Sequence, residues 1–305
     1  MEYKITKEQK DKTTDLEKST IAIVDSVDSK VYYILLRDEA DIQYKHNIVY
    51  IKNLNSITNI QNLYCIITNK NITNKTFNNI KIYSIEEFYE KELYKIYIKN
   101  DKYAKEIKSF SKKQYIQKRF FDLIVSIPAL ILALPIIVYS AYRIKKESPD
   151  GPVFYSQTRV TKNEKTFKCY KLRSMRTDVN YHSNNITEND PRLFKWGKFM
   201  RKTRIDEIPQ LFNVIKGDIH LIGPRAEWIK MAKLHEKTIP NYNLRHINKT
   251  GITGYAQVKC PSARDINETK EKFMHELYYI KNWNIWFEFK ILFQTLLVIL
   301  SKKGK

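Results

Sequence analysis

The N-terminal third of the chain lacks the two residues that most often shape tight turns. No proline precedes Pro128 and no glycine precedes Gly151, although the 305 residues include nine prolines and seven glycines. A loop that cradles a nucleotide phosphate needs glycine where the backbone approaches the phosphate. This absence favours a structural or regulatory role for the N-terminal third over cofactor binding, and it places a domain boundary near residue 111.

Cysteine is also scarce. Cys65, Cys169 and Cys260 have neither the spacing of a metal site nor the even number of a disulfide framework, so we predict reduced thiols on a cytosolic face. The N-terminal residues 1–20 are polar and of mixed charge. They therefore do not resemble a cleavable signal peptide.

Acidic residues are too few to balance the basic ones, and the excess is unevenly placed. The net charge is +21, of which residues 1–110 contribute +2 and residues 111–305 contribute +19. A domain this basic is expected to meet a polyanion: nucleic acid, an anionic membrane surface or a phosphorylated substrate.

Short β-branched runs alternate with other structure in residues 1–110, which predicts a small α/β domain of Rossmann-like type. The predicted strands are "TIAIVDS", "NIVYIKNL", "LYCIITN" and "IKIYS". "SIEEFYEKEL" predicts a helix in which Ser84 is the N-cap and Glu87 completes a capping box.

Residues 120–144, "FFDLIVSIPALILALPIIVYSAYRI", form an apolar run. As a straight helix it would extend about 37 Å at about 1.5 Å per residue, enough to cross a bilayer. Two features favour a re-entrant hairpin instead. Basic residues flank both ends, which places both ends on the cytoplasmic side, and Pro128 and Pro135 interrupt the helix.

The C-terminal stretch combines aromatic residues, about ten mostly apolar residues and a basic tail. The apolar part is too short to span a membrane, so we predict an amphipathic helix lying in the membrane plane. An ordinary core helix is the alternative. The aromatic residues expected at the interface are Tyr278, Tyr279, Trp283 and Trp286.

Residues 201–225, "RKTRIDEIPQLFNVIKGDIHLIGPR", place two adjacent carboxylates, Asp206 and Glu207, among five cations. We expect Thr203 to cap a helix whose first turn carries both acids, near the positive end of its dipole. One carboxylate can then attack or activate while the other holds a hard metal ion, and the arginines suit phosphate oxygens. A capped surface helix with incidental charges is the structural alternative.

These residues lie within a series of motifs that resembles the bacterial sugar transferase family, the monotopic polyprenol-phosphate phosphoglycosyl transferases. The resemblance extends over about residues 115–303 and keeps the family's order. The motifs are "FFDLIVS", "GPVFYSQTRV", "FKCYKLRSM", "DPRLFKWGKFMRKTRIDEIPQLFNVIKGDIHLIGPR", "GITGYAQV", "FMHELYYIKNW" and "FEFKILFQTLLVIL".

The resemblance implies transfer of a phosphosugar from a UDP-sugar to undecaprenyl phosphate, with release of UMP, at the cytoplasmic face of the bacterial inner membrane. It implies that Asp206 is the nucleophile, forming a covalent phosphosugar-enzyme, and that Glu207 helps Asp206 to hold Mg²⁺. The resemblance also places five residues near the phosphates, the nucleotide or the floor of the active site: Arg201, Arg225, Lys171, Arg173 and Gln257. It also places the break of the hydrophobic hairpin at Pro135.

The implied architecture is a small, truncated Rossmann-like domain (residues 1–110) and a mainly α-helical monotopic membrane domain (residues 111–305). The latter contains the re-entrant hairpin and amphipathic helices. Anionic lipid is the expected surface partner. The sequence leaves open which sugar is carried, which glycan is built and whether the chain is a homo-oligomer.

Several positions depart from the family's usual residues. Ser-Leu before the acid pair is here Arg204-Ile205. The proline of the Pro-Arg-Pro motif is here Ala226, which we expect to loosen that turn, and the acid of the "LDVYY" motif is here Glu276.

Three rival interpretations remain at this stage. A nucleic-acid-binding protein accounts for the basic charge but not for the apolar run or for carboxylates among the cations, so no nucleic acid is expected. A non-catalytic membrane scaffold leaves Asp206 and Glu207 without a role. Direct transfer with Asp206 as a general base is the alternative mechanism.

Overall fold

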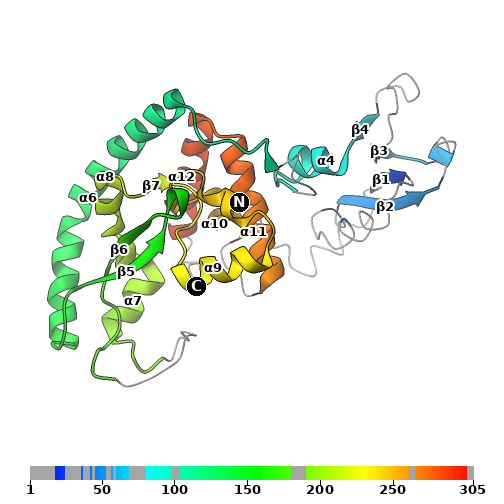
Figure 1. The fold of residues 1–305 in the computed structure, drawn as a ribbon. Helices are drawn as coiled ribbons and strands as arrows, with labels where there is room; N and C mark the ends of the chain where they lie inside the picture. Colours follow the sequence, from blue (N-terminus) through cyan, green and yellow to red (C-terminus); the bar gives the residue numbers. More distant parts are fainter. Residues whose placement is uncertain are drawn as a thin grey trace. The chain divides into compact units, whose positions relative to one another are not determined.

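The computed structural model divides the chain into two compact units, Met1–Tyr97 and Ile98–Lys305 (Figure 1). The described residues are 18–24, 36, 42, 45–52, 56–57, 60–68, 80–97, 104–179, 190–260 and 265–300. The polar N-terminal residues 1–17 and the basic tail 301–305 lie outside them.

The N-terminal unit contains a four-stranded parallel sheet in the order β2-β1-β3-β4. The strands are β1 (Ser19–Val24), β2 (His46–Ile51), β3 (Leu63–Ile67) and β4 (Lys81–Tyr83). The central strand β1 is buried from Thr20 to Val24, as expected where both faces of a parallel sheet are covered. The four strands overlap the four predicted runs, with β1 and β2 each beginning one residue earlier, and the parallel pairing confirms the α/β class.

Helix α4 (Ile85–Glu92) begins as predicted. The Ser84 hydroxyl accepts the Glu87 N–H, and the Glu87 carboxylate accepts the Ser84 N–H. Each bond satisfies a backbone donor that the first helical turn leaves unpaired, so this capping box fixes the start of the helix.

The C-terminal unit is mainly helical. Its helices are α6 (Lys112–Glu147), α7 (Lys195–Thr203), α8 (Gln210–Lys216), α9 (Ile229–Thr238), α10 (Tyr255–Lys259), α11 (Ile266–Lys281) and α12 (Ile285–Leu300). Two small sheets join them: the antiparallel pair β5 (Phe154–Val160) and β6 (Thr166–Leu172), and the parallel pair β7 (His220–Ile222) and β8 (Gly251–Thr253).

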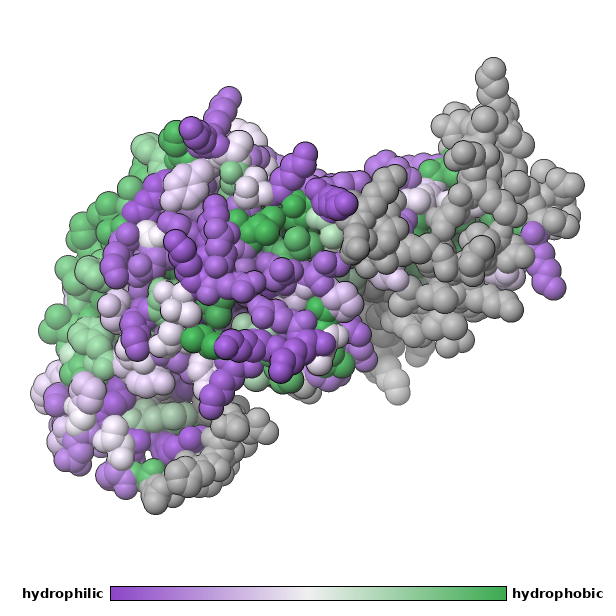
Figure 2. All heavy atoms as spheres, viewed as in Figure 1, coloured by the Kyte–Doolittle hydropathy of each residue, from purple (hydrophilic) through white to green (hydrophobic). Residues whose placement is uncertain are grey.

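Helix α6 contains the apolar run and exposes most of it. Among the described helices it is the one long and apolar enough to cross a membrane. Leu132 is 77% exposed and Val138 is 67% exposed, which distinguishes α6 from the buried core helix of a soluble protein. Figure 2 shows apolar side chains gathered along the edge of the unit where α6 lies.

The two prolines bend α6 but do not break it. Pro128 and Pro135 both lie inside one helix, whose ribbon curves in Figure 1. The break expected at Pro135 is therefore not seen, and neither are two separate arms of a hairpin. A proline removes one backbone hydrogen bond and pushes the preceding turn aside, which bends a helix while the flanking turns keep their own bonds.

Both ends of α6 are nevertheless attached to the same unit. Near its start, the buried Lys118 Nζ lies 2.7 Å from Glu288 Oε2 of α12. Near its end, Glu147 Oε2 accepts the Trp196 N–H of α7 at 2.8 Å, and Ile144 packs in the core with Met200. The apolar middle of α6 is thus held at both ends by one folded body.

The aromatic residues expected at a membrane interface divide between exposed and buried positions around α12. Trp286 is 76% exposed, whereas Tyr279 and Trp283 are buried and donate hydrogen bonds to Glu288 Oε1, at 2.5 Å and 2.6 Å. The exposed face of α12 is apolar as well, through residues such as Phe293. Sequence periodicity could not predict that the buried Glu288 accepts hydrogen bonds from two of the aromatic side chains.

Candidate active site

The acid pair lies in a short 3₁₀ helix between α7 and α8, not in the first turn of an α-helix. Arg204 has a left-handed backbone (φ 59°) that ends α7, and Ile205–Glu207 form the 3₁₀ helix. Thr203 is therefore not an N-cap. Its hydroxyl donates back to the Phe199 carbonyl at 2.8 Å, the usual bond of a threonine at a helix end.

The two carboxylates have different environments. Asp206 is 6% exposed. Glu207 Oε1 accepts a 2.7 Å hydrogen bond from Lys171 Nζ at the end of β6, while Arg204 lies 3.7 Å and Arg225 3.8 Å from the same carboxylate. Glu207 is thus surrounded by three cations.

The environments push the two pKa values apart. Burial, with a contribution from Glu207, raises the pKa of Asp206 to about 6 against the opposing effects of Lys171 and Arg201. Burial would also raise the pKa of Glu207, but Lys171 and Arg225 outweigh it and lower that pKa to about 2. A pair of acids separated in this way is typical of sites where the two carboxylates perform different tasks.

Asn213, which the sequence did not single out, fixes the strand that carries Lys171. The side chain is fully buried, donates to the Lys168 carbonyl at 2.8 Å and accepts the Tyr170 N–H at 3.1 Å. It also donates to Asp218, the third acid of this stretch. Asp218 therefore contributes to the scaffold and not to the acid pair. A lone asparagine in an apolar run gives no periodic signal that would predict this role.

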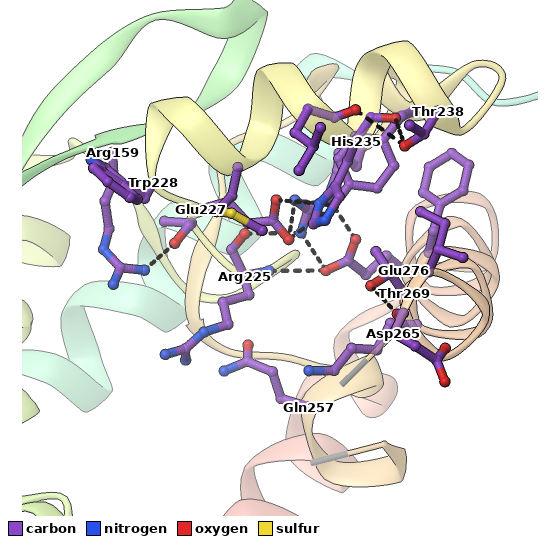
Figure 3. Close-up of a pocket in the computed structure, with 18 residues that line it drawn as sticks. Arg159, Arg225, Glu227, Trp228, His235, Thr238, Gln257, Asp265, Thr269 and Glu276 are labelled. Carbon is purple, nitrogen blue, oxygen red and sulfur yellow. Dashed lines mark hydrogen bonds and ion pairs between the residues drawn. The ribbon is translucent and has the colours of Figure 1, made fainter. Parts of the chain in front are cut away.

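A cavity of about 670 Å³ lies beside Arg225, and Figure 3 shows the residues that line it. Asp206 and Glu207 do not line it, but Arg225 belongs to both the cavity wall and the cations around Glu207. The polar wall also includes Arg159, Lys272 and Gln257, while α9 contributes apolar side chains. Cationic and apolar side chains in one cavity wall suit a ligand that carries both phosphates and a ring.

Gln257 presents an acceptor in this wall. Its Nε2 donates to the Ile252 carbonyl at 3.0 Å, which assigns the amide orientation. The Oε1 atom is buried and has no hydrogen-bond partner among the described residues. An unpartnered buried acceptor is costly unless a ligand donor satisfies it.

Arg173 is not brought to the acid pair. Its guanidinium is buried and donates to the Pro152 carbonyl, the Ser148 hydroxyl and the Ser148 carbonyl, each at 2.6 Å. These bonds join the end of β6 to the turn after α6. The structure thus places Lys171, Arg201, Arg225 and the acid pair together, and it places Gln257 in the wall of the cavity. It gives Arg173 a structural role instead.

The donor set of the acid pair fits a magnesium ion that is completed by substrate oxygens. Mg²⁺ takes one or two protein carboxylates together with phosphate oxygens and water. Asp206 and Glu207 offer two such carboxylates, and the cations around them suit the phosphates that would complete the shell.

Known proteins resemble the C-terminal unit. The chain is 42% identical over 188 residues to the UDP-N-acetylgalactosamine-undecaprenyl-phosphate N-acetylgalactosaminephosphotransferase of Aeromonas hydrophila, covering 61% of this chain and 44% of that protein. It is 38% identical over 195 residues to the exopolysaccharide production protein PSS of Rhizobium leguminosarum bv. phaseoli, covering 61% of this chain and 96% of that protein.

A third relative is the UDP-glucose:undecaprenyl-phosphate glucose-1-phosphate transferase of Escherichia coli K12, at 38% identity over 181 residues, covering 58% of this chain and 39% of that protein. The chain thus spans less than half the length of the Aeromonas and Escherichia relatives. The profile of the bacterial sugar transferase family matches residues 113–302, nearly the whole C-terminal unit. Since that match covers more than half of the chain, the protein belongs to the bacterial sugar transferase family.

Proposed function

We propose that the C-terminal unit transfers a sugar phosphate from a UDP-sugar to undecaprenyl phosphate and releases UMP, as a membrane step of surface glycan or glycoconjugate synthesis. The names of the relatives give this reaction class. The observation that carries the proposal is the divided acid pair: a buried Asp206 beside a Glu207 held ionised by Lys171 and Arg225. The relatives act on different sugars, so the sugar is left to experiment.

In the proposed first step, a carboxylate oxygen of Asp206 attacks the β-phosphorus of the UDP-sugar. The bond between that phosphorus and the oxygen bridging to the α-phosphate breaks, and UMP leaves with the bridging oxygen. In the second step, a phosphate oxygen of undecaprenyl phosphate attacks the same phosphorus and releases the Asp206 carboxylate. The product is a sugar linked to the lipid through a diphosphate.

The cations around the acid pair are suited to phosphate charge. Arg201 lies close enough to Asp206 to lower its pKa, and Arg225 lies between Glu207 and the cavity. Guanidinium groups hold phosphate oxygens through parallel hydrogen bonds, and fixed cations stabilise charge that develops during phosphoryl transfer. The cavity wall with Gln257 would then receive the nucleotide.

We assign Mg²⁺ to Asp206 and Glu207. The ion would neutralise the diphosphate and polarise the phosphorus toward attack. The pKa of about 2 keeps Glu207 ionised and able to ligate at any working pH.

The lipid substrate is expected to approach along α6 and α12, whose exposed faces are apolar. Because one folded body holds both ends of α6, we propose that this helix enters and leaves the same face of the membrane. Exposed lysines at both ends, Lys113 and Lys146, support a cytoplasmic location for that face and suit anionic lipid.

The test is turnover in lipid nanodiscs with undecaprenyl phosphate, Mg²⁺ and a panel of UDP-sugars, followed by UMP release. The proposal predicts UMP release with at least one sugar, its loss in Asp206→Asn, and dependence on Mg²⁺. If the wild-type protein stays in the membrane but releases no UMP with any of the sugars, a non-catalytic scaffold would be supported instead. Direct transfer with Asp206 as base is the alternative mechanism, and the mass of the intact protein after incubation with the UDP-sugar alone separates the two.

A further inference from the structure

Arg225 has a side chain that must reach the acid pair from a short turn. It follows β7, its guanidinium is partly exposed, and Nη2 lies 3.8 Å from Glu207 Oε1. The residue after it is Ala226, where a proline would have restricted the turn. Contrary to the expectation of a loosened turn, neighbouring side chains and strands fix the backbone of this segment.

The peptide groups of Arg225 are held from two sides. The Arg225 N–H donates to Glu276 Oε1 of α11 at 3.1 Å, and the Arg225 carbonyl accepts from Arg245 Nη2 at 2.9 Å. Figure 3 shows Glu276 turned toward the Arg225 backbone while the Arg225 guanidinium extends away from it. The Arg225 guanidinium is thus available to the acid pair and the cavity.

Arg245 and Glu276, which bond the peptide groups of Arg225, also form an ion pair with each other. Arg245 Nε and Nη2 donate to the two oxygens of Glu276 at 2.7 Å and 2.6 Å, in the bidentate geometry that fixes both planes. Arg245 is 1% exposed and Glu276 is 5% exposed. A second acid, Glu227, lies 3.1 Å from the far side of Arg245.

The flanking carbonyls are also engaged. The Pro224 carbonyl accepts the Gly251 N–H of β8 at 2.8 Å, and the Ala226 carbonyl accepts from Arg159 Nη1. All three carbonyls from Pro224 to Ala226 are thereby bonded, so rotation of the turn would break several hydrogen bonds at once.

We propose that Arg245 and Glu276 are positioning residues that hold the Arg225 guanidinium beside the acid pair. They act through the Arg225 backbone. Only the expected effect on the rate rests on the proposed function. A misplacement of about 1 Å in a group that stabilises a transition state costs about a hundredfold in rate.

The kinetic test compares Glu276→Gln and Arg245→Lys with wild type. Glu276→Gln keeps the shape but loses the bidentate ion pair, and Arg245→Lys keeps the charge but loses the planar fork. We expect kcat to fall about 10- to 100-fold in both, as for residues that orient a catalytic group, with KM for the UDP-sugar changed less than about threefold. Glu276→Asp, which keeps the charge, should recover part of kcat.

A structural readout separates this proposal from the proposed function. Hydrogen–deuterium exchange of the full chain in nanodiscs should show faster exchange in peptides covering residues 221–228 for Glu276→Gln. Glu92→Gln, which disturbs a polar cluster of the N-terminal unit, is the control and should leave both exchange and kcat unchanged.

Unchanged exchange over residues 221–228 overturns the positioning role, whether or not the wild type turns over. A rise in KM at unchanged kcat also overturns it, because the pair would then contact the ligand directly. If Glu276→Gln does not fold, Glu276→Asp is measured in its place, with the same two outcomes. If the wild type releases no UMP, the proposed function fails while the exchange result still decides the positioning role.

A separate cluster of possible metal ligands lies where α10 meets α11. Cys260, Glu271 and His275 bring one ligand atom each to within 4.8 Å of one another. Glu271 and His275 are four residues apart and share one face of α11, and Cys260 is the C-cap of α10. The sequence spacing did not predict this site, because its ligands come from two helices.

We infer that these three residues bind Zn²⁺ or a similar thiophilic divalent ion. A thiolate, an imidazole and a carboxylate are zinc ligands, whereas Mg²⁺ prefers oxygen alone, so this site is distinct from the acid pair. A bound ion would join α10, which carries Gln257, to α11, which carries Lys272 of the cavity wall.

The test is titration of the full chain with Co²⁺ in metal-free buffer, recording the thiolate-to-cobalt charge-transfer band. We expect one equivalent with this band, its displacement by Zn²⁺, and its loss in both Cys260→Ser and Glu271→Gln. Cys65→Ser, which changes a buried cysteine in the N-terminal unit, should retain it. Absence of the band in wild type, or its persistence in Cys260→Ser, overturns the site.

Discussion

Lys171 Nζ lies 2.7 Å from Glu207 Oε1, and this contact distinguishes two adjacent carboxylates that the sequence presents as equals. Lys171 is the largest of the opposing charges that lower the pKa of Glu207 to about 2, while Asp206 beside it is raised to about 6. The site thus holds one carboxylate that is ionised throughout the physiological range and one whose ionisation depends on pH.

The first prediction concerns the pH dependence of activity. Because Asp206 must be ionised to attack phosphorus or to accept a proton, kcat/KM should fall on the acid side with a limb near pH 6, which reports the free enzyme. UMP release between pH 5 and pH 8.5 at subsaturating Mg²⁺ measures this, and saturating Mg²⁺ should move the limb to lower pH because a bound cation favours the ionised carboxylate. A flat profile across that range would contradict the assignment of the essential carboxylate.

The second prediction concerns stability. An aspartate whose pKa rises from 3.8 in the unfolded chain to about 6 in the folded protein binds its proton more tightly when folded. That contribution is present below about pH 4 and is lost as pH rises through 6, where the ionised group costs about 3 kcal/mol. Asp206→Asn should therefore raise the melting temperature at pH 7.5 and leave it unchanged near pH 4. A variant less stable than wild type at pH 7.5 would contradict the burial of an ionised carboxylate.

The third prediction concerns Lys171. Replacing it with methionine removes the main charge that opposes burial at both acids, so both pKa values should rise. We expect kcat/KM at pH 7.5 to fall about 10- to 100-fold and the acid limb to move above pH 6. Lys168→Met, an exposed change on the same strand, is the matched control and should leave the profile unchanged. Loss of activity without movement of the limb would indicate damage to the scaffold instead.

The fourth prediction concerns the path of α6 through the membrane. In a background without native cysteines, Lys113→Cys and Lys146→Cys should react with a membrane-impermeant maleimide from the same side, in inside-out vesicles. Leu132→Cys, at an exposed position in the middle of the helix, should not react from either side because lipid covers it. Labelling of Lys113→Cys and Lys146→Cys from opposite sides would show a spanning helix.

The local features of the fold were predictable from sequence because neighbouring residues determine them. β-branched runs located the four parallel strands, and Ser84 with Glu87 located the start of α4. The exposed apolar helix was equally clear. The effect of Pro135 was not predictable from sequence, because whether a proline bends or breaks a helix depends on what holds the helix on either side of it.

The site was predicted as a set of residues but not as an arrangement. Asp206 and Glu207 were singled out as adjacent acids among cations, and the family resemblance implied their roles, yet Thr203 ends a helix where it was expected to start one. Arg173 was expected near the nucleotide, but carbonyl groups of the turn after α6 occupy its donors. The contacts of Arg245 and Glu276 with Arg225 join residues 20 and 51 positions apart, and no local pattern encodes such contacts.

The central claim is that Asp206 becomes covalently attached to the sugar phosphate. Intact-protein mass should be measured after incubation with Mg²⁺ and each UDP-sugar, in the absence of lipid acceptor. We expect a gain equal to one phosphosugar with the true donor and no gain in Asp206→Asn. No gain with any donor, from protein that still forms the lipid-linked product once undecaprenyl phosphate is added, would contradict it and assign Asp206 the role of a base.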